Sequence, residues 1–151
     1  MREIGINDGA FAVKGTGART VVHLSVDGQK GLRLLSEASH RLYLCLEEVR
    51  GTRDATVLNV YLFGMPDEPS SRLAGSAALF GLRMASLPGG ENEGTGLTFT
   101  FDVTDFLKEP EERTDIPVGI APVRQLPETS DISIGKVFLF WNRERVVGCK
   151  H

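Results

Sequence analysis

Histidine is the first residue type to consider, because neutral imidazole is the commonest metal ligand in proteins and can act as a general base near neutral pH. The chain contains three histidines, His23, His40 and His151. They lie in three different segments, and no HxxxH or HxxE spacing places two ligands on one helix face. We therefore expect no metal site from these residues alone.

The other residue types that carry chemistry are equally scattered. No G-x-S-x-G elbow is present for a serine nucleophile. Glu47 and Glu48 are adjacent, so on a strand they would point to opposite faces and could not cooperate as an acid–base pair. The acidic cluster at 109–115 predicts a solvated loop, because the spaced Asp/Asn/Gly pattern of a calcium loop is missing. The chain is therefore expected not to be an enzyme by itself.

Size and composition indicate one ordinary globular domain. The chain has 151 residues, 41% of them hydrophobic and 25% charged. The net charge of −3 comes from scattered Lys, Arg, Asp and Glu, which argues against nucleic-acid binding. No apolar run is long enough to span a bilayer and no export signal is visible, so we expect a soluble chain without a membrane partner, of unknown localisation. Cys45 is expected to be a small buried residue, and the role of Cys149 is left open.

Period-two alternation places most of the chain in short strands. The segments 41–49 and 57–63 alternate most clearly, and the polar break between them predicts a central β-hairpin. Residues 4–9 are expected to form a lead-in, 27–39 a loop with helical turns, 64–72 and 86–96 surface loops, and 105–109 a short helix that ends at Pro110. Gly135 is expected to mark a bulge that shifts the inward phase. The predicted strands are 10–14, 19–26, 41–49, 57–63, 75–84, 97–103, 116–123 and 131–141.

About eight short strands with one short helix and no βαβ alternation predict an all-β fold, an antiparallel β-sandwich or barrel. We expect a single sandwich domain over residues 1–141 and a flexible C-terminal tail over 142–151. Such a domain would work by binding, capping or assembly.

The order of several segments resembles the C-terminal domain of bacterial tyrosinase-family proteins. The plant polyphenol oxidase C-terminal domain is a more distant relative. Asn59 stands where that family has an aspartate. The resemblance covers residues 5–141 and rests on RLYLCLEEVRGTRDATVLNVYLFGMPDE (41–68), AGSAALFGL (74–82), GLTFTFDVTDFL (96–107), IPVGIAPV (116–123) and ISIGKVFLFW (132–141).

The resemblance implies a β-sandwich that packs over the type 3 dicopper site of a separate helical tyrosinase domain. It implies a partner in cis or in trans, with copper held by that partner and not by this chain. In some members one side chain of the sandwich reaches into the copper site. Met65 and Phe63 are conceivable for that role, but core packing is the expected role of Phe63 and plain exposure that of Met65. The candidate partner-facing loop residues are Met65, Pro66, Leu87 and Pro88.

Two other functions stay open at this stage. One is a free-standing module that recognises a protein, a glycan or a small molecule through the loops at 64–72 and 86–96, although these loops carry no aromatic side chains. The other is a hydrolase, for which the sequence offers no candidate site. An unpaired partner surface could also form a homodimer.

Overall fold

The computed structural model describes residues 2–26, 28, 40–51, 57–63, 71–88, 94–106, 114–129 and 131–143. A short helix, α2 (Leu82–Ser86), and a 3-10 turn, η2 (Thr104–Phe106), are present among them. The strands are β1 (Arg2–Ile6), β2 (Phe11–Ala12), β3 (Ala18–Leu24), β4 (His40–Arg50), β5 (Val57–Phe63), β6 (Ser71–Ala78), β7 (Leu97–Asp102), β8 (Asp115–Pro122) and β9 (Ser133–Arg143).

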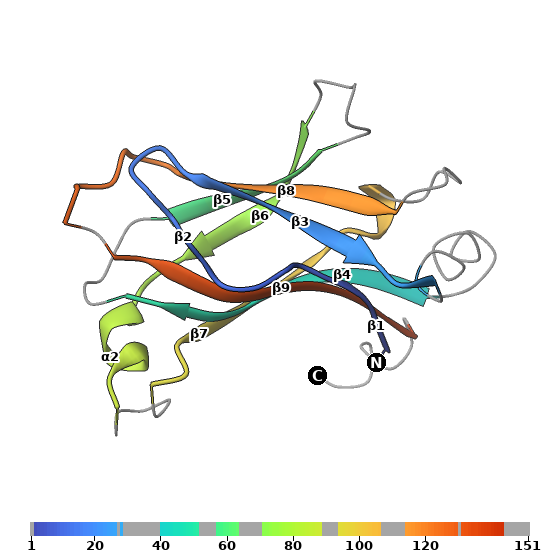
Figure 1. The fold of residues 1–151 in the computed structure, drawn as a ribbon, viewed down its shortest axis with the longest axis horizontal. Helices are drawn as coiled ribbons and strands as arrows, with labels where there is room; N and C mark the ends of the chain where they lie inside the picture. The colour runs from blue at the N-terminus through green and yellow to red at the C-terminus, as the bar shows by residue number, and fades with distance from the viewer. Residues whose placement is uncertain are drawn as a thin grey trace.

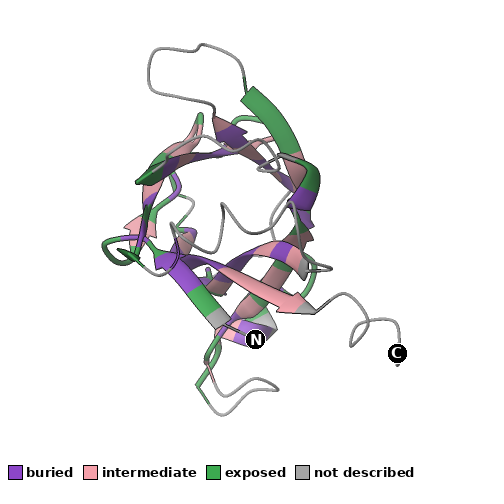
Figure 2. Ribbon diagram, turned by 90° about the vertical axis from the view of Figure 1, so that its right-hand side faces the viewer, coloured by how far each residue is buried: buried purple, intermediate pink, exposed green. Residues whose placement is uncertain are grey.

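The strands form one strongly curved antiparallel sheet. Eight of them follow the order β6-β5-β8-β3-β1-β9-β4-β7, and β2 pairs with β9 off this path (Figure 1). The sheet curves into a nearly complete ring (Figure 2). Its two edge strands pack together where the Phe101 ring of β7 lies directly against Gly75 of β6. The prediction of an antiparallel all-β fold built from short strands is confirmed.

The interior of the ring is filled by the apolar residues that alternate along the strands. Leu42, Leu44 and Leu46 of β4 are fully buried, and Leu58, Val60 and Leu62 of β5 are buried with them in the same core. Fully burying one such side chain contributes about 1.5–3 kcal/mol. The inward faces of these two strands are therefore as the sequence predicts.

The predicted hairpin of β4 with β5 is wrong. β4 pairs with β9 on one side and β7 on the other, and β5 pairs with β6 and β8. Alternation determines which face of a strand is buried, but it carries no information about which strand lies alongside. Each of the two strands has a neighbouring strand on both sides, but the outward-facing Tyr61 and Phe63 of β5 are only partly buried, so the expectation that both faces are covered is wrong for β5.

A paired distortion of β4 and β9 shifts the inward phase of both strands. On β9, Ile134 and Val137 are both buried although they are three residues apart, which confirms the predicted shift at Gly135. On β4, Glu48 takes a φ of 56°, a conformation that costs about 1 kcal/mol or more for a residue other than glycine. A Cβ at Gly135 would lie 2.7 Å from the Glu48 Cβ, so glycine is required where Gly135 of β9 lies beside Glu48 of β4.

The region after β5 differs from the predicted strand at 75–84. β6 begins earlier, at Ser71, and ends at Ala78, and Gly81 with φ 76° turns the chain into α2. Fully buried Leu82 anchors this short helix in the core, which is why a segment without helical periodicity forms a helix. The helix predicted at 105–109 is represented by η2, and residues 107–109 lie outside the described residues.

The two ends of the chain also differ in detail from expectation. The lead-in at 4–9 contains β1, which pairs with β3 and β9. At the other end β9 continues to Arg143, and residues 144–151 of the predicted tail lie outside the described residues. The loop predicted with helical turns at 27–39 also lies outside them, apart from residue 28.

Candidate functional site

The outer surface of β3, β8, β5 and β6 carries an unusually apolar set of side chains for a sheet face that does not point into the core. Cross-strand register aligns Arg19, Gly119, Tyr61 and Leu73 in one row across the four strands. Neighbouring rows add further apolar residues. We call this surface the Gly119 face and define it by Arg19, Val21, Tyr61, Phe63, Leu73, Pro117, Gly119, Ala121 and Val123.

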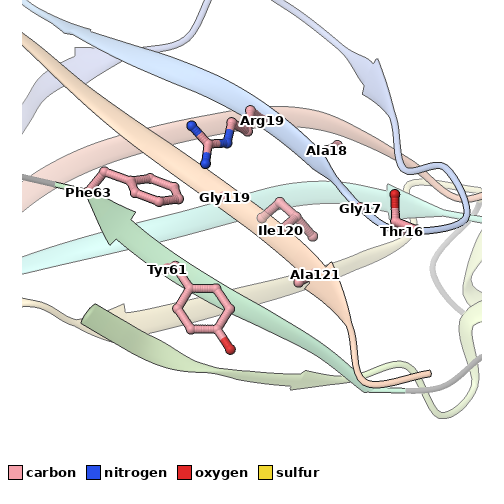
Figure 3. A pocket seen from close by; sticks show the side chains of 9 residues that line it. All are labelled: Thr16, Gly17, Ala18, Arg19, Tyr61, Phe63, Gly119, Ile120 and Ala121. Atoms are coloured by element: carbon pink, nitrogen blue, oxygen red, sulfur yellow. The ribbon is translucent and has the colours of Figure 1, made fainter. Parts of the chain in front are cut away.

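A hollow of about 350 Å³ lies at the centre of the Gly119 face. Its floor is β8 at Gly119, and the aromatic side chains of Tyr61 and Phe63 flank it (Figure 3). A Cβ at Gly119 would lie 2.7 Å from Cε2 of Phe63, so the glycine lets that ring lie across the strand. The missing side chain at this outward position of β8 therefore sets the place of the Phe63 ring, which lines one side of the hollow.

Arg19 completes the wall of the hollow. Its guanidinium lies 4.2 Å from the centroid of the Phe63 ring, and the two side chains point toward each other across β8 (Figure 3). This cation–π contact is worth about 0.5–1 kcal/mol at an exposed site. Among the described residues Arg19 has no carboxylate partner.

One end of the same surface carries a charged cluster. His23 of β3 lies opposite Asp115 of β8, and its Nδ1 is 2.8 Å from an Asp115 carboxylate oxygen. Its Nε2 is 3.2 Å from a carboxylate oxygen of Asp8. The hydrogen bond to Asp115, followed by that to Asp8, raises the pKa of His23 above 6.5. Both ring nitrogens thus face carboxylates, which suits a surface ion-pair cluster better than a catalytic base.

The hollow is suited to binding rather than to catalysis. Tyr61, Thr16 and Arg19 contribute its polar side-chain groups, and no carboxylate, imidazole or thiol lines it among the described residues. General acid–base and nucleophilic mechanisms need such groups within hydrogen-bond reach of a substrate. An apolar hollow with one guanidinium can instead accept a protruding apolar group that carries a neighbouring negative charge.

The buried polar side chains are committed to the fold. Asn7 donates to the Gly9 carbonyl and accepts from the Val137 amide, and Thr104 Oγ1 accepts from the Leu42 amide. Cys45 is a buried free thiol, as predicted, and burial raises its pKa, so the thiol is protonated at neutral pH. These groups are therefore structural.

Of the predicted partner-facing residues, Leu87 and Pro88 lie just after α2 and are exposed, Leu87 by 39%. Met65 and Pro66 lie outside the described residues. Phe63, for which core packing was expected, lies half-buried on the outer surface instead. No helix in the described part of the chain is long and apolar enough to cross a membrane. Within that same part, no group of three or more His, Cys, Asp or Glu could hold a metal ion.

Two features of the surface were missed by sequence reasoning. Phe80 falls within the predicted strand 75–84, but it lies in the turn after β6 and is 79% exposed. The hollow was missed because it needs residues from three strands. Gly119 in the middle of an otherwise apolar strand was the available signal, since a strand glycine often marks a close approach of another group.

Comparisons with known proteins identify relatives of the whole chain. Residues 1–142 match the family model described as "Domain of unknown function (DUF7868)". The chain is 26% identical over 149 residues to the tyrosinase HcTyr1 of Hahella sp. (strain CCB-MM4), covering 92% of this chain but only 32% of that protein.

The chain is also similar in fold to a solved structure of a polyphenol oxidase. A recombinant latent aurone synthase, a polyphenol oxidase co-crystallized with hexatungstotellurate(VI), matches with a TM-score of 0.50 at 12% identity, over 88% of this chain and 25% of the other. A second structure of recombinant latent aurone synthase matches with a TM-score of 0.49 at 13% identity, over 88% and 26% of the two chains.

This chain therefore corresponds to only a third or less of the proteins it matches. The resemblance to the C-terminal domain of tyrosinase-family proteins is confirmed. The chain belongs to the DUF7868 family, whose fold recurs as one region of tyrosinases and polyphenol oxidases.

Proposed function

We propose that this domain is a non-catalytic accessory domain that packs against a tyrosinase-like catalytic domain and limits access to its dicopper site. One observation carries the proposal. The match to the Hahella tyrosinase takes in nearly this whole chain and leaves about two thirds of that tyrosinase without a counterpart here. The catalytic machinery of the relative is then expected in the part that this chain lacks.

The histidine content of this chain also supports a non-catalytic role. The type 3 dicopper site of the tyrosinase family uses two triads of histidines, and this chain has three histidines in all. His23 is held by two carboxylates, and His40 begins β4. The residues of this chain do not fit a dicopper centre, so we derive no copper-dependent step for it.

The test uses the Hahella tyrosinase in three forms: intact, truncated by removal of the third that matches this chain, and a fusion in which this chain replaces that third. Copper content and oxidation of a simple catechol are measured for all three, and for this chain alone. We expect the truncated form to be the most active and the fusion to be several-fold less active, at equal copper content. This chain alone should bind no copper pair and oxidise no catechol.

Two results would contradict the proposal. A fusion as active as the truncated form would show that this domain does not limit access to the site. Stoichiometric copper and catechol turnover in the isolated chain would show that the domain is itself catalytic.

A further inference from the structure

We infer that the Gly119 face is the surface by which this domain docks on the catalytic domain, and that the partner inserts an apolar side chain into the hollow and brings a carboxylate to Arg19. This inference rests on the proposed function, because it names the surface and the chemistry of the same contact. Its support comes from exposure, from charge and from the shape at Gly119.

Two apolar side chains of the Gly119 face are exposed to solvent. Leu73, next to Tyr61 in the register of β6 with β5, is 49% exposed, and Val123 beyond the end of β8 is 57% exposed. Leu73 therefore lies beside Tyr61, which lines the hollow, and Val123 lies beside Val57 at the other end of β5, where its amide donates to the Val57 carbonyl. Exposed apolar side chains beside a depression are typical of protein–protein contact sites.

The positive charge of Arg19 requires a carboxylate from the partner. Burying the Arg19 guanidinium in a contact would be costly unless a carboxylate met it, since a desolvated charge needs a partner. Among the described residues none is available within this chain. Stacking on Phe63 holds the guanidinium plane in place while leaving its N–H groups able to bind a carboxylate in bidentate fashion.

Shape favours an inserted side chain over a flat contact. The missing Cβ at position 119 lets the Phe63 ring lie against β8, and this ring, Tyr61 and Thr16 line a notch that is open to solvent. Such a notch admits one protruding group and desolvates it against aromatic rings. An apolar anchor in a pocket beside a charged pair is the arrangement that carries most of the energy of a protein interface.

The outer surface of β9, β4 and β7 lacks these properties. We call it the Phe138 face and define it by Glu3, Arg41, Tyr43, Cys45, Thr98, Thr100, Asp102, Lys136, Phe138 and Phe140. Its cations have partners within the domain: Lys136 lies 3.4 Å from Glu3 and Arg41 lies 3.6 Å from Asp102. It therefore supplies a matched control for every measurement on the Gly119 face.

The test is a labelling footprint on the fusion described above, in which this chain replaces the matching third of the Hahella tyrosinase. Leu73→Cys on the Gly119 face and Thr98→Cys on the Phe138 face are made separately in a Cys149→Ser background. Buried Cys45 gives little background because its thiol is protonated and covered. The rate of maleimide labelling of each variant is measured in the isolated chain and in the fusion.

We expect labelling of Leu73→Cys to be at least tenfold slower in the fusion than in the isolated chain, and labelling of Thr98→Cys to change less than twofold. Adding Arg19→Glu to the Leu73→Cys fusion should raise its labelling rate at least threefold, because like charges would then meet at the contact. The matched reversal Lys136→Glu should leave that rate unchanged.

The outcomes separate this inference from the proposed function. A fusion with suppressed catechol oxidation in which Leu73→Cys labels as fast as in the isolated chain overturns the assignment of the face and leaves the capping role intact. Protection of Thr98→Cys instead assigns the Phe138 face. A fusion with full catechol oxidation and no protection at either position overturns the proposed function together with the inference.

Discussion

The two outer faces of the sheet each carry a cation above a phenylalanine ring. Arg19 lies over Phe63 on the Gly119 face, and Lys136 lies 4.5 Å from the Phe138 centroid on the Phe138 face. The surroundings differ. Phe138 is only 4% exposed, its ring is 5.8 Å from that of Phe140, and Lys136 is also paired with Glu3. Phe63 is half-buried beside an open hollow.

The difference shows that the same pairwise contact can serve two purposes. Where the ring is covered and the cation has a carboxylate, the pair closes a surface and stabilises the fold. Where the ring borders a hollow and the cation has no carboxylate among the described residues, the guanidinium can still bind a carboxylate from a partner. The predictions below test this contrast, beginning with the largest effect.

Truncating the Phe138 and Phe63 side chains should give the largest difference in stability between the two faces. Phe138→Ala should lower the free energy of unfolding by about 3 kcal/mol, because this ring is almost completely buried although it belongs to the outer face. Phe63→Ala should lower it by only about 1 kcal/mol, because the ring is only partly buried. Urea unfolding followed by tryptophan fluorescence measures both. Equal losses would show that the Phe63 ring is as much a part of the folded core as Phe138.

The two outer-face glycines should also respond differently. Gly135→Ala should cost about 2 kcal/mol, because its Cβ would meet the Cβ of Glu48, which is fixed to a strained backbone. Gly119→Ala should cost no more than about 1 kcal/mol, because it displaces only the Phe63 ring, whose complete removal is expected to cost about that much. Thermal unfolding compares them. A large loss at position 119 would mean that the ring is held rigidly over β8.

Removing each cation should have a smaller effect with a distinct dependence on salt. Arg19→Gln and Lys136→Gln should each lower stability by about 0.5 kcal/mol. The loss at Lys136 should shrink in 1 M NaCl, because part of it comes from the exposed ion pair with Glu3. Urea unfolding at low and high salt separates the two. The same salt sensitivity at Arg19 would reveal a carboxylate close to its guanidinium.

The smallest effect concerns the charged end of the Gly119 face. The carboxylates of Asp115 and Asp8 raise the pKa of His23 above 6.5 in the folded protein. The stabilisation is therefore fully present below the unfolded value and is lost as the pH rises through the raised folded value. His23→Gln should lower the melting temperature at pH 5 and leave it nearly unchanged at pH 9. A loss of equal size at both pH values would show that the charge of His23 contributes nothing.

The candidate site could be predicted only in part, because its members are distant in sequence. Arg19, Tyr61 and Gly119 come from three strands and meet through the register of β3 and β5 with β8. Alternation placed Tyr61 and Phe63 opposite the leucines of β5, but did not show what lay beside them. Leu87 and Pro88 belong to the predicted surface loop at 86–96 and are exposed, whereas exposed Phe80 falls within the predicted strand 75–84.

The amino-acid sequence by itself determined the class of the fold, the inward faces of β4 and β5 and the phase shift at Gly135, because side-chain alternation and glycine conformation act locally. It also carried the tyrosinase-family resemblance. The tertiary structure decided that β4 and β5 do not pair, that Leu82 anchors a helix, and that Phe63 lies outside the core beside a hollow. These outcomes depend on which distant strands share a register, and one strand's hydrophobic pattern is compatible with many neighbours.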